Sequence, residues 1–176
     1  AREQGFHFEG LFILYAMMED RLSSFLYYAG VINSKRDKLT KNKKVKPYIE
    51  EALAPLGDRK YRIRSISNKI LIIQHLISDS QTYTPNKSPT SYQDHLCSQI
   101  HKTKNWDIMN ESLNAIQNWS KSRNELVHAL LSRNVANQEE KLILLIEDGY
   151  RFCRQLDNFV RSFKKENTIR KQFNIQ

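Results

Sequence analysis

The chain has 176 residues, a net charge of +9 at pH 7 and a sequence pI near 9.6. Its content of 40% hydrophobic and 27% charged residues excludes a disordered chain, and its length predicts a single domain over residues 1–176. The five glycines and four prolines favour helices over a β-sandwich. The positive charge favours polyanionic partners, although a basic surface that only keeps a protein soluble has the same composition.

Neither a membrane span nor a signal peptide is expected. No apolar run approaches the roughly 18 residues that a bilayer span needs, and no signal sequence is visible. Cys97 and Cys153 lie far apart, without metal-ligand spacing, which indicates free thiols in a reducing compartment. We therefore expect a cytoplasmic protein that contacts no membrane and requires no metal or other cofactor.

The first predicted helix covers residues 8–32. Its apolar residues recur at alternating spacings of three and four, which is typical of a helical bundle. They are Leu11, Tyr15, Met18, Leu22, Phe25, Leu26 and Ala29. Glu19 lies at the edge of this stripe, where it is either an ordinary flanking carboxylate or the partner that holds Arg123 in place.

Residues 33–46 are predicted to be a loop or a frayed segment, because seven of the last twelve are Lys or Arg and like charges at this density repel one another. Lys41, Lys43 and Lys44 are candidate contacts to an RNA backbone. The alternative is a solvated mobile loop.

A short helix over 48–56 precedes a longer one over 58–78, whose basic first half adds Arg62 and Arg64 to the candidate RNA contacts.

The rest of the chain also reads as helical. A polar loop is expected over 79–89, and helices over 90–102, 106–134 and 138–165, followed by a frayed basic tail over 166–176. The elements together predict an all-α bundle of about five helices.

The helix predicted over residues 106–134 carries the candidate site. At about 100° per residue, its apolar side chains share one arc, and Arg123 falls near the middle of that arc. Asn124 and His128 share the edge of the arc, about 40° apart. A guanidinium on a buried stripe is costly unless it is paired or faces a polar cleft. The pattern therefore places a permanent cation, an amide and a titratable imidazole together beside the core.

Arg followed by four to six residues and then His is a weak pattern, since chance gives about one instance in a chain of this composition. Arg2 and His7 form a second instance. The requirement for Asn directly after Arg reduces the chance expectation to roughly a few hundredths. Arg123 satisfies it.

The sequence Arg123-Asn124-x-x-x-His128 resembles the R-x4-6-H motif of HEPN domains, including the polar residue that active members carry after the Arg. It is most similar to the HEPN ribonucleases of RNA-guided type VI CRISPR effectors and of abortive-infection toxins. The resemblance implies a HEPN-like bundle, a homodimer with a composite active site, and a metal-independent endoribonuclease in a toxin or phage-defence setting. A protein or RNA antitoxin is a possible further partner, although Leu130 stands where some HEPN toxins have a Tyr that an antitoxin modifies.

Cleavage of RNA next to its own 2′-OH needs proton transfer and positive charge near the phosphate. His128 is suited to proton transfer because histidine titrates near neutral pH, and Arg123 offers planar bidentate donors. Asn124 can orient the imidazole or hydrogen-bond the phosphate. The alternative is an inactive helical module that binds RNA, nucleotide or a protein partner, in which Arg123 forms a structural ion pair with Glu19.

Overall fold

The computed structural model is an all-α helical bundle, as predicted. It describes residues 2–33, 38–54, 57, 63, 65–84, 88, 90–103, 106–132, 138–165 and 169–175. The helices within these ranges are α1 (Arg2–Tyr28), α2 (Lys46–Leu53), α3 (Ile66–Thr82), α4 (Tyr92–Lys102), α5 (Trp106–Leu131), α6 (Glu139–Lys165) and α7 (Ile169–Gln172).

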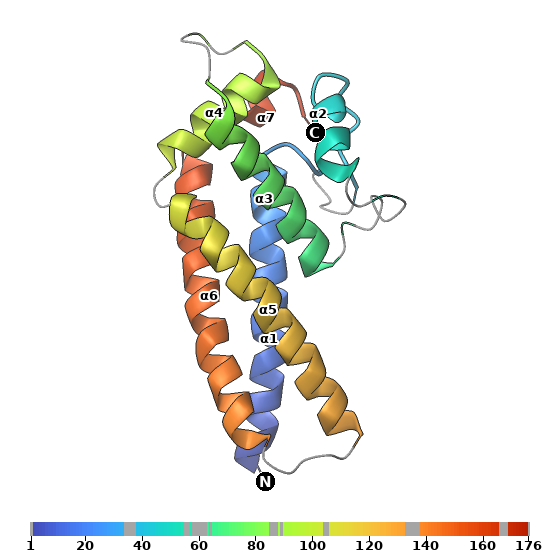
Figure 1. Cartoon of the computed structure of the whole chain (residues 1–176), viewed down its shortest axis with the longest axis vertical. Coiled ribbons are helices and arrows are strands. Elements are labelled where there is room, and N and C mark those ends of the chain that lie inside the picture. Colours follow the sequence, from blue (N-terminus) through green and yellow to red (C-terminus); the bar gives the residue numbers. More distant parts are fainter. Residues whose placement is uncertain are drawn as a thin grey trace.

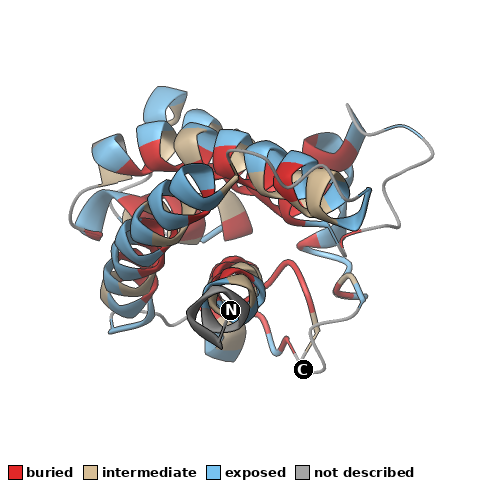
Figure 2. Cartoon of the chain, turned by 90° about the horizontal axis from the view of Figure 1, so that it is seen from below, coloured by how far each residue is buried: buried red, intermediate tan, exposed pale blue. Residues whose placement is uncertain are grey.

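Three long helices form the body of the bundle. Figure 1 shows α1 and α6 side by side along the long axis, with α5 crossing them in the opposite direction and with α2, α4 and α7 gathered at the end away from the N-terminus. Phe25 of α1 packs against two rings of α6, stacked on Phe159 with centroids 5.4 Å apart and tilted against Phe163 with centroids 4.5 Å apart. Buried residues lie on the sides of the helices that face one another (Figure 2), so the core follows the apolar stripes of the sequence.

A glycine lets α6 approach both α1 and α5 just before the candidate motif. A Cβ on Gly149 would come within 2.9 Å of Leu14 Cδ1 and 3.1 Å of Trp119 Cζ2, so any larger residue would push the helices apart. The indole Nε1 of Trp119 also donates to the carbonyl oxygen of Leu145 at 2.7 Å. These contacts fix the position of α5 at Trp119, one helical turn before Arg123.

Several helix bounds differ from the prediction. The first helix begins at Arg2 rather than at residue 8, and the second begins at Lys46 rather than at residue 48. The first helix stops at Tyr28 rather than at residue 32, because Gly30 adopts a φ of 78°, a left-handed conformation that ends helices. The third helix continues to Thr82 rather than to residue 78, and Tyr83 N donates to Asp79 O at its end. Most of residues 58–65, including the candidate contacts Arg62 and Arg64, lie outside the described residues.

The expectation of a frayed tail is wrong for residues 169–175. Ile169, Phe173 and Ile175 are buried, and Arg170 Nη1 donates to Tyr27 O at 2.9 Å and Ile32 O at 3.0 Å. The tail therefore caps the end of α1, where the carbonyl groups of a helix otherwise lack partners.

Both cysteines are free thiols, as predicted, and both are buried. Burial raises the pKa of the Cys153 thiol to about 11 and also raises the pKa of Cys97. None of the helices in the described ranges is long and apolar enough to cross a membrane.

Candidate functional site

Arg123 projects from α5 onto two aromatic rings of α1. Its Cζ lies 4.4 Å from the ring centroid of Phe12 and 4.8 Å from that of Tyr15. The side chain is half-buried, and this burial lowers the pKa of the guanidinium, while the nearby Tyr15 phenol acts in the opposite direction. Arginine stays protonated at neutral pH in proteins, so the structure holds a fixed positive charge on an aromatic support.

Asn124 is the polar neighbour of that charge. Arg123 Nη1 donates to Asn124 Oδ1 at 3.0 Å, which uses one of the five guanidinium donors. The buried Nε of Arg123 has no hydrogen-bond partner among the described residues. The buried Nε is out of reach of an anion in solvent, so the donors left for an anion are the three Nη N–H groups that no described residue uses. The exposed amide of Asn124 keeps its NH2 group for a second contact.

His128 lies on the exposed side of α5, one turn after Asn124. Four residues of helix separate the two by about 6 Å along the axis and about 40° around it. Within the described part of the chain the imidazole forms no hydrogen bond, and Leu131, three residues further on, is 73% exposed. The arrangement presents an amide, an imidazole and an apolar side chain to the solvent beside the half-buried arginine.

The expected direct ion pair between Glu19 and Arg123 is not formed. Glu19 Oε1 instead lies 2.8 Å from the Nζ of Lys69, on α3. The Lys69 side chain is only 6% exposed, so its buried ammonium requires a counter-charge, whereas Arg123 rests on aromatic rings. Lys69 was not predicted as the partner of Glu19, although its place between Ile66, Ile70 and Ile73 in the apolar stripe of α3 indicated a buried position.

The candidate RNA contacts Lys41, Lys43 and Lys44 do not join the motif. All three are exposed and lie beyond the C-terminal end of α1, whereas Arg123 lies over Phe12 and Tyr15. The thirteen residues from Tyr15 to the end of α1 correspond to about 20 Å of helix. The basic segment and the motif are therefore at separate places on the bundle.

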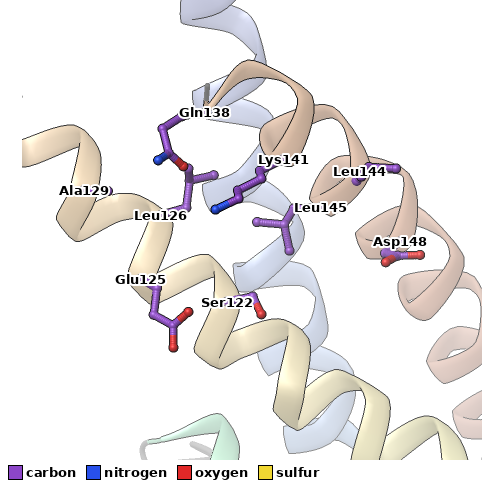
Figure 3. Close-up of a pocket in the computed structure, with 9 residues that line it drawn as sticks. All are labelled: Ser122, Glu125, Leu126, Ala129, Gln138, Lys141, Leu144, Leu145 and Asp148. Atoms are coloured by element: carbon purple, nitrogen blue, oxygen red, sulfur yellow. The ribbon is translucent and has the colours of Figure 1, made fainter. Parts of the chain in front are cut away.

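A groove of about 430 Å³ lies between α5 and α6. Figure 3 shows Leu126 and Leu145 between the two helices, with Glu125 on α5 and Lys141 and Asp148 on α6. None of the three motif residues lines this groove, so it is distinct from the candidate site. Among the described residues, no three His, Cys, Asp or Glu side chains gather closely enough to hold a metal ion.

Comparison of the chain with protein-family models, with curated proteins and with solved structures found no match. The resemblance of Arg123-Asn124-x-x-x-His128 to the HEPN motif therefore stays a prediction from the sequence.

Proposed function

We propose that the chain is a metal-independent endoribonuclease of the HEPN type, acting on single-stranded RNA in a toxin or phage-defence setting. The observation that carries the proposal is the Arg-Asn-x-x-x-His sequence on one helix. Its arginine is seated on Phe12 and Tyr15 and its Asn124 and His128 are exposed on consecutive turns. Attack by the 2′-OH of RNA on its own phosphate needs a proton-transfer group and positive charge near the phosphate, which an imidazole and a guanidinium supply, and the amide can assist.

In the proposed reaction, the 2′-oxygen attacks the adjacent phosphorus and the bond to the 5′-oxygen breaks. The 2′-OH loses a proton and the leaving oxygen gains one, so the products are a 2′,3′-cyclic phosphate and a 5′-hydroxyl. His128 transfers protons, Arg123 binds the phosphoryl oxygens as negative charge develops on them, and Asn124 assists by orienting either the imidazole or the phosphate.

We further propose that two copies of the chain form one site. One motif supplies one proton-transfer group, whereas the reaction benefits from a base at the 2′-OH and an acid at the leaving oxygen. A two-fold dimer repeats the same patch and so supplies both. Exposed apolar side chains flank the motif, namely Phe12 at 44% and Leu131 at 73% exposure, and contact between copies would remove them from water.

The second candidate is a non-catalytic helical module that binds RNA, nucleotide or a protein partner. The packing of Arg123 on Phe12 and Tyr15 favours this module, because the same contacts are expected of an arginine that only stabilises the fold. In this case Asn124 and His128 have no role in proton transfer.

Incubation of the purified protein with end-labelled single-stranded RNA in EDTA separates these two candidates. The nuclease proposal predicts cleavage in EDTA at the rate seen with Mg²⁺, because none of its steps uses a metal. A protein that binds this RNA but leaves it intact under both conditions is the non-catalytic module.

Arg123→Lys tests the role of the guanidinium. We expect a loss of roughly a hundredfold in cleavage rate, because lysine keeps the charge but lacks the planar fork for the phosphate. Stability should fall by about 1 kcal/mol or less, since an ammonium still lies over the Phe12 and Tyr15 rings. Single-turnover cleavage and thermal unfolding measure the two effects, and a variant with wild-type cleavage rates would remove Arg123 from the site.

Mixed dimers test whether the site is shared. Heterodimers of wild-type and His128→Ala subunits, isolated with two different affinity tags, should be severely impaired, because each composite site then lacks one of its two imidazoles. Wild-type homodimers carried through the same separation are the control. Heterodimers that keep half the wild-type rate would show that each protomer acts alone.

A further inference from the structure

Residues 38–45 form a loop, one of the two expectations from the sequence, and contacts to the rest of the chain support it. Ile32 and Leu39 form an antiparallel bridge, Thr40 N donates to Val31 O at 2.9 Å, and Val45 is completely buried. These contacts attach both ends of the segment to the core.

A second set of contacts ties the middle of the segment to the C-terminal tail. The side-chain Nδ2 of Asn42 donates to the backbone oxygen of Phe173, and its Oδ1 accepts from Lys44 N at 2.9 Å. One asparagine thus links the segment to the tail and shapes the turn that follows it. These contacts therefore support the backbone of the turn that carries the exposed lysines.

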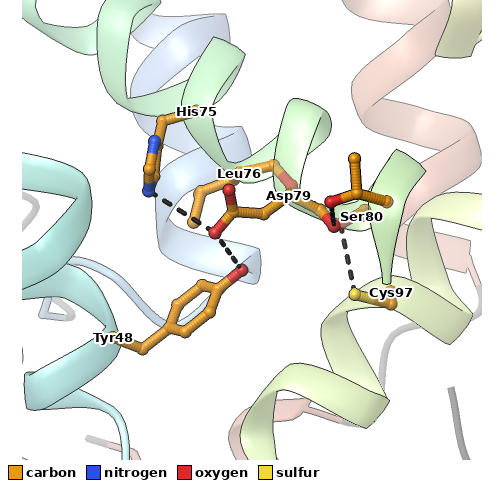
Figure 4. Close-up of polar contacts among 7 residues, drawn as sticks. Tyr48, His75, Leu76, Asp79, Ser80 and Cys97 are labelled. Carbon is orange, nitrogen blue, oxygen red and sulfur yellow. Dashed lines mark hydrogen bonds and ion pairs between the residues drawn. The ribbon is translucent and has the colours of Figure 1, made fainter. Parts of the chain in front are cut away.

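The helix that follows this turn is anchored by a partly buried polar contact. Tyr48 donates its hydroxyl to Asp79 Oδ2 of α3 at 3.0 Å, and His75 Nε2 lies 3.4 Å from the same oxygen; Figure 4 shows both contacts. Burial, and then the hydrogen bond to Asp79, raise the pKa of the Tyr48 phenol, so it remains a neutral donor. Helix α2 is therefore fixed on α3, and the lysine turn is fixed with it.

The charges of this segment serve no visible structural purpose. Lys38, Lys41, Lys43 and Lys44 are exposed, and in the described part of the chain none of them forms an ion pair. Only their neighbour Lys46 does, with Glu50 at 3.4 Å. Several of these lysines precede the N-terminus of α2, where positive charge opposes the helix dipole and lowers stability. Uncompensated charge that costs stability is expected at a binding surface rather than in a structural role.

We infer that Lys38, Lys41, Lys43 and Lys44 form a preformed platform that binds the phosphate backbone of single-stranded RNA away from the cleavage motif. The inference rests on the proposed function for the choice of RNA. It adds a second contact about 20 Å along α1 from Arg123. Every exposed side chain from Lys38 to Lys46 is a lysine. The segment therefore offers no exposed apolar anchor of the kind that strengthens binding to a lipid surface.

The platform should increase affinity for RNA without taking part in the chemical step. Phosphate contacts far from the reacting bond stabilise the bound substrate and the transition state equally, so they lower KM and leave kcat unchanged. Each phosphate contact also releases counterions. On single strands, one contact therefore adds about 0.7 to the magnitude of the slope of log K against log salt.

The test is a binding titration with labelled single-stranded RNA, carried out with His128→Ala protein so that no RNA is cut. The variant Lys41→Gln, Lys43→Gln, Lys44→Gln should bind at least roughly tenfold more weakly at low salt, with the salt slope reduced by up to about 2. The matched control removes the same three charges elsewhere, as Lys102→Gln, Lys141→Gln, Arg154→Gln, all exposed positions. This control should retain most of the affinity and the slope.

Equal affinities and slopes for the two triple variants would overturn the platform, as would tighter binding of phosphatidylserine vesicles than of RNA. This result is separate from the outcome of the cleavage assay. If wild-type protein does not cut RNA but binds it through the platform, the proposed nuclease fails and the platform stands. If it cuts RNA and the two triple variants bind alike, the nuclease stands and the platform fails.

Discussion

His128→Ala should abolish RNA cleavage while leaving the fold intact. Loss of a general acid–base group typically costs 10²–10⁴-fold in rate, and a shared site loses both of its imidazoles in the homodimer. The His128 side chain is exposed, so its removal should change the free energy of unfolding by no more than about 0.5 kcal/mol. Single-turnover cleavage of single-stranded RNA and thermal unfolding together measure both quantities.

His7→Ala is the matched control for this variant. His7 is also exposed on a helix and ends the second Arg-to-His pattern of the chain, which lacks the Asn after Arg2. Its removal should leave cleavage unchanged. If both variants cut RNA at the wild-type rate, His128 does not transfer the proton.

Glu19→Ala should be among the most destabilising single substitutions in the protein, because it leaves the Lys69 ammonium buried without a partner. Removal of one member of a buried pair costs about 3–5 kcal/mol. Since the Glu19 side chain is 35% exposed, solvent should reduce the cost to about 2–3 kcal/mol. Thermal unfolding should show a decrease in Tm of roughly 5–10 °C for a chain of this length.

Two further variants identify the cause of this loss. Glu9→Ala removes an exposed carboxylate from the same helix and should change stability by less than about 0.5 kcal/mol. Glu19→Leu combined with Lys69→Met replaces both charges with apolar groups, and should recover most of the loss. Wild-type stability of Glu19→Ala would show that Lys69 does not depend on the ion pair.

The helices were predictable because their apolar residues follow one period. Leu11, Met18, Leu22 and Phe25 recur on α1 at the helical spacing and are all buried, and the same regularity marked α5 and α6. The short α7 was missed, because a four-residue helix has little local stability and depends on burial of Ile169 and its neighbours against the end of α1.

The helical positions of the candidate residues were predictable, but their partners on other helices were not. Local spacing placed Asn124 and His128 on one side of a helix, and the apolar arc placed Arg123 against the core. The choice of partners across helices could not be read in this way. Glu19 and Lys69 are fifty residues apart, and Arg123 is supported by Phe12 and Tyr15, neither of which was expected to contact it.

The chemical ends of the RNA products test the central claim most directly. A single-stranded RNA oligonucleotide is incubated with wild-type protein in EDTA, and the masses of the fragments are measured by mass spectrometry. Attack by the 2′-OH under the control of Arg123, Asn124 and His128 predicts 2′,3′-cyclic phosphate on the upstream fragment and a 5′-hydroxyl on the downstream one. Fragments that end in a 3′-hydroxyl, or cleavage that appears only when Mg²⁺ is restored, would contradict the account.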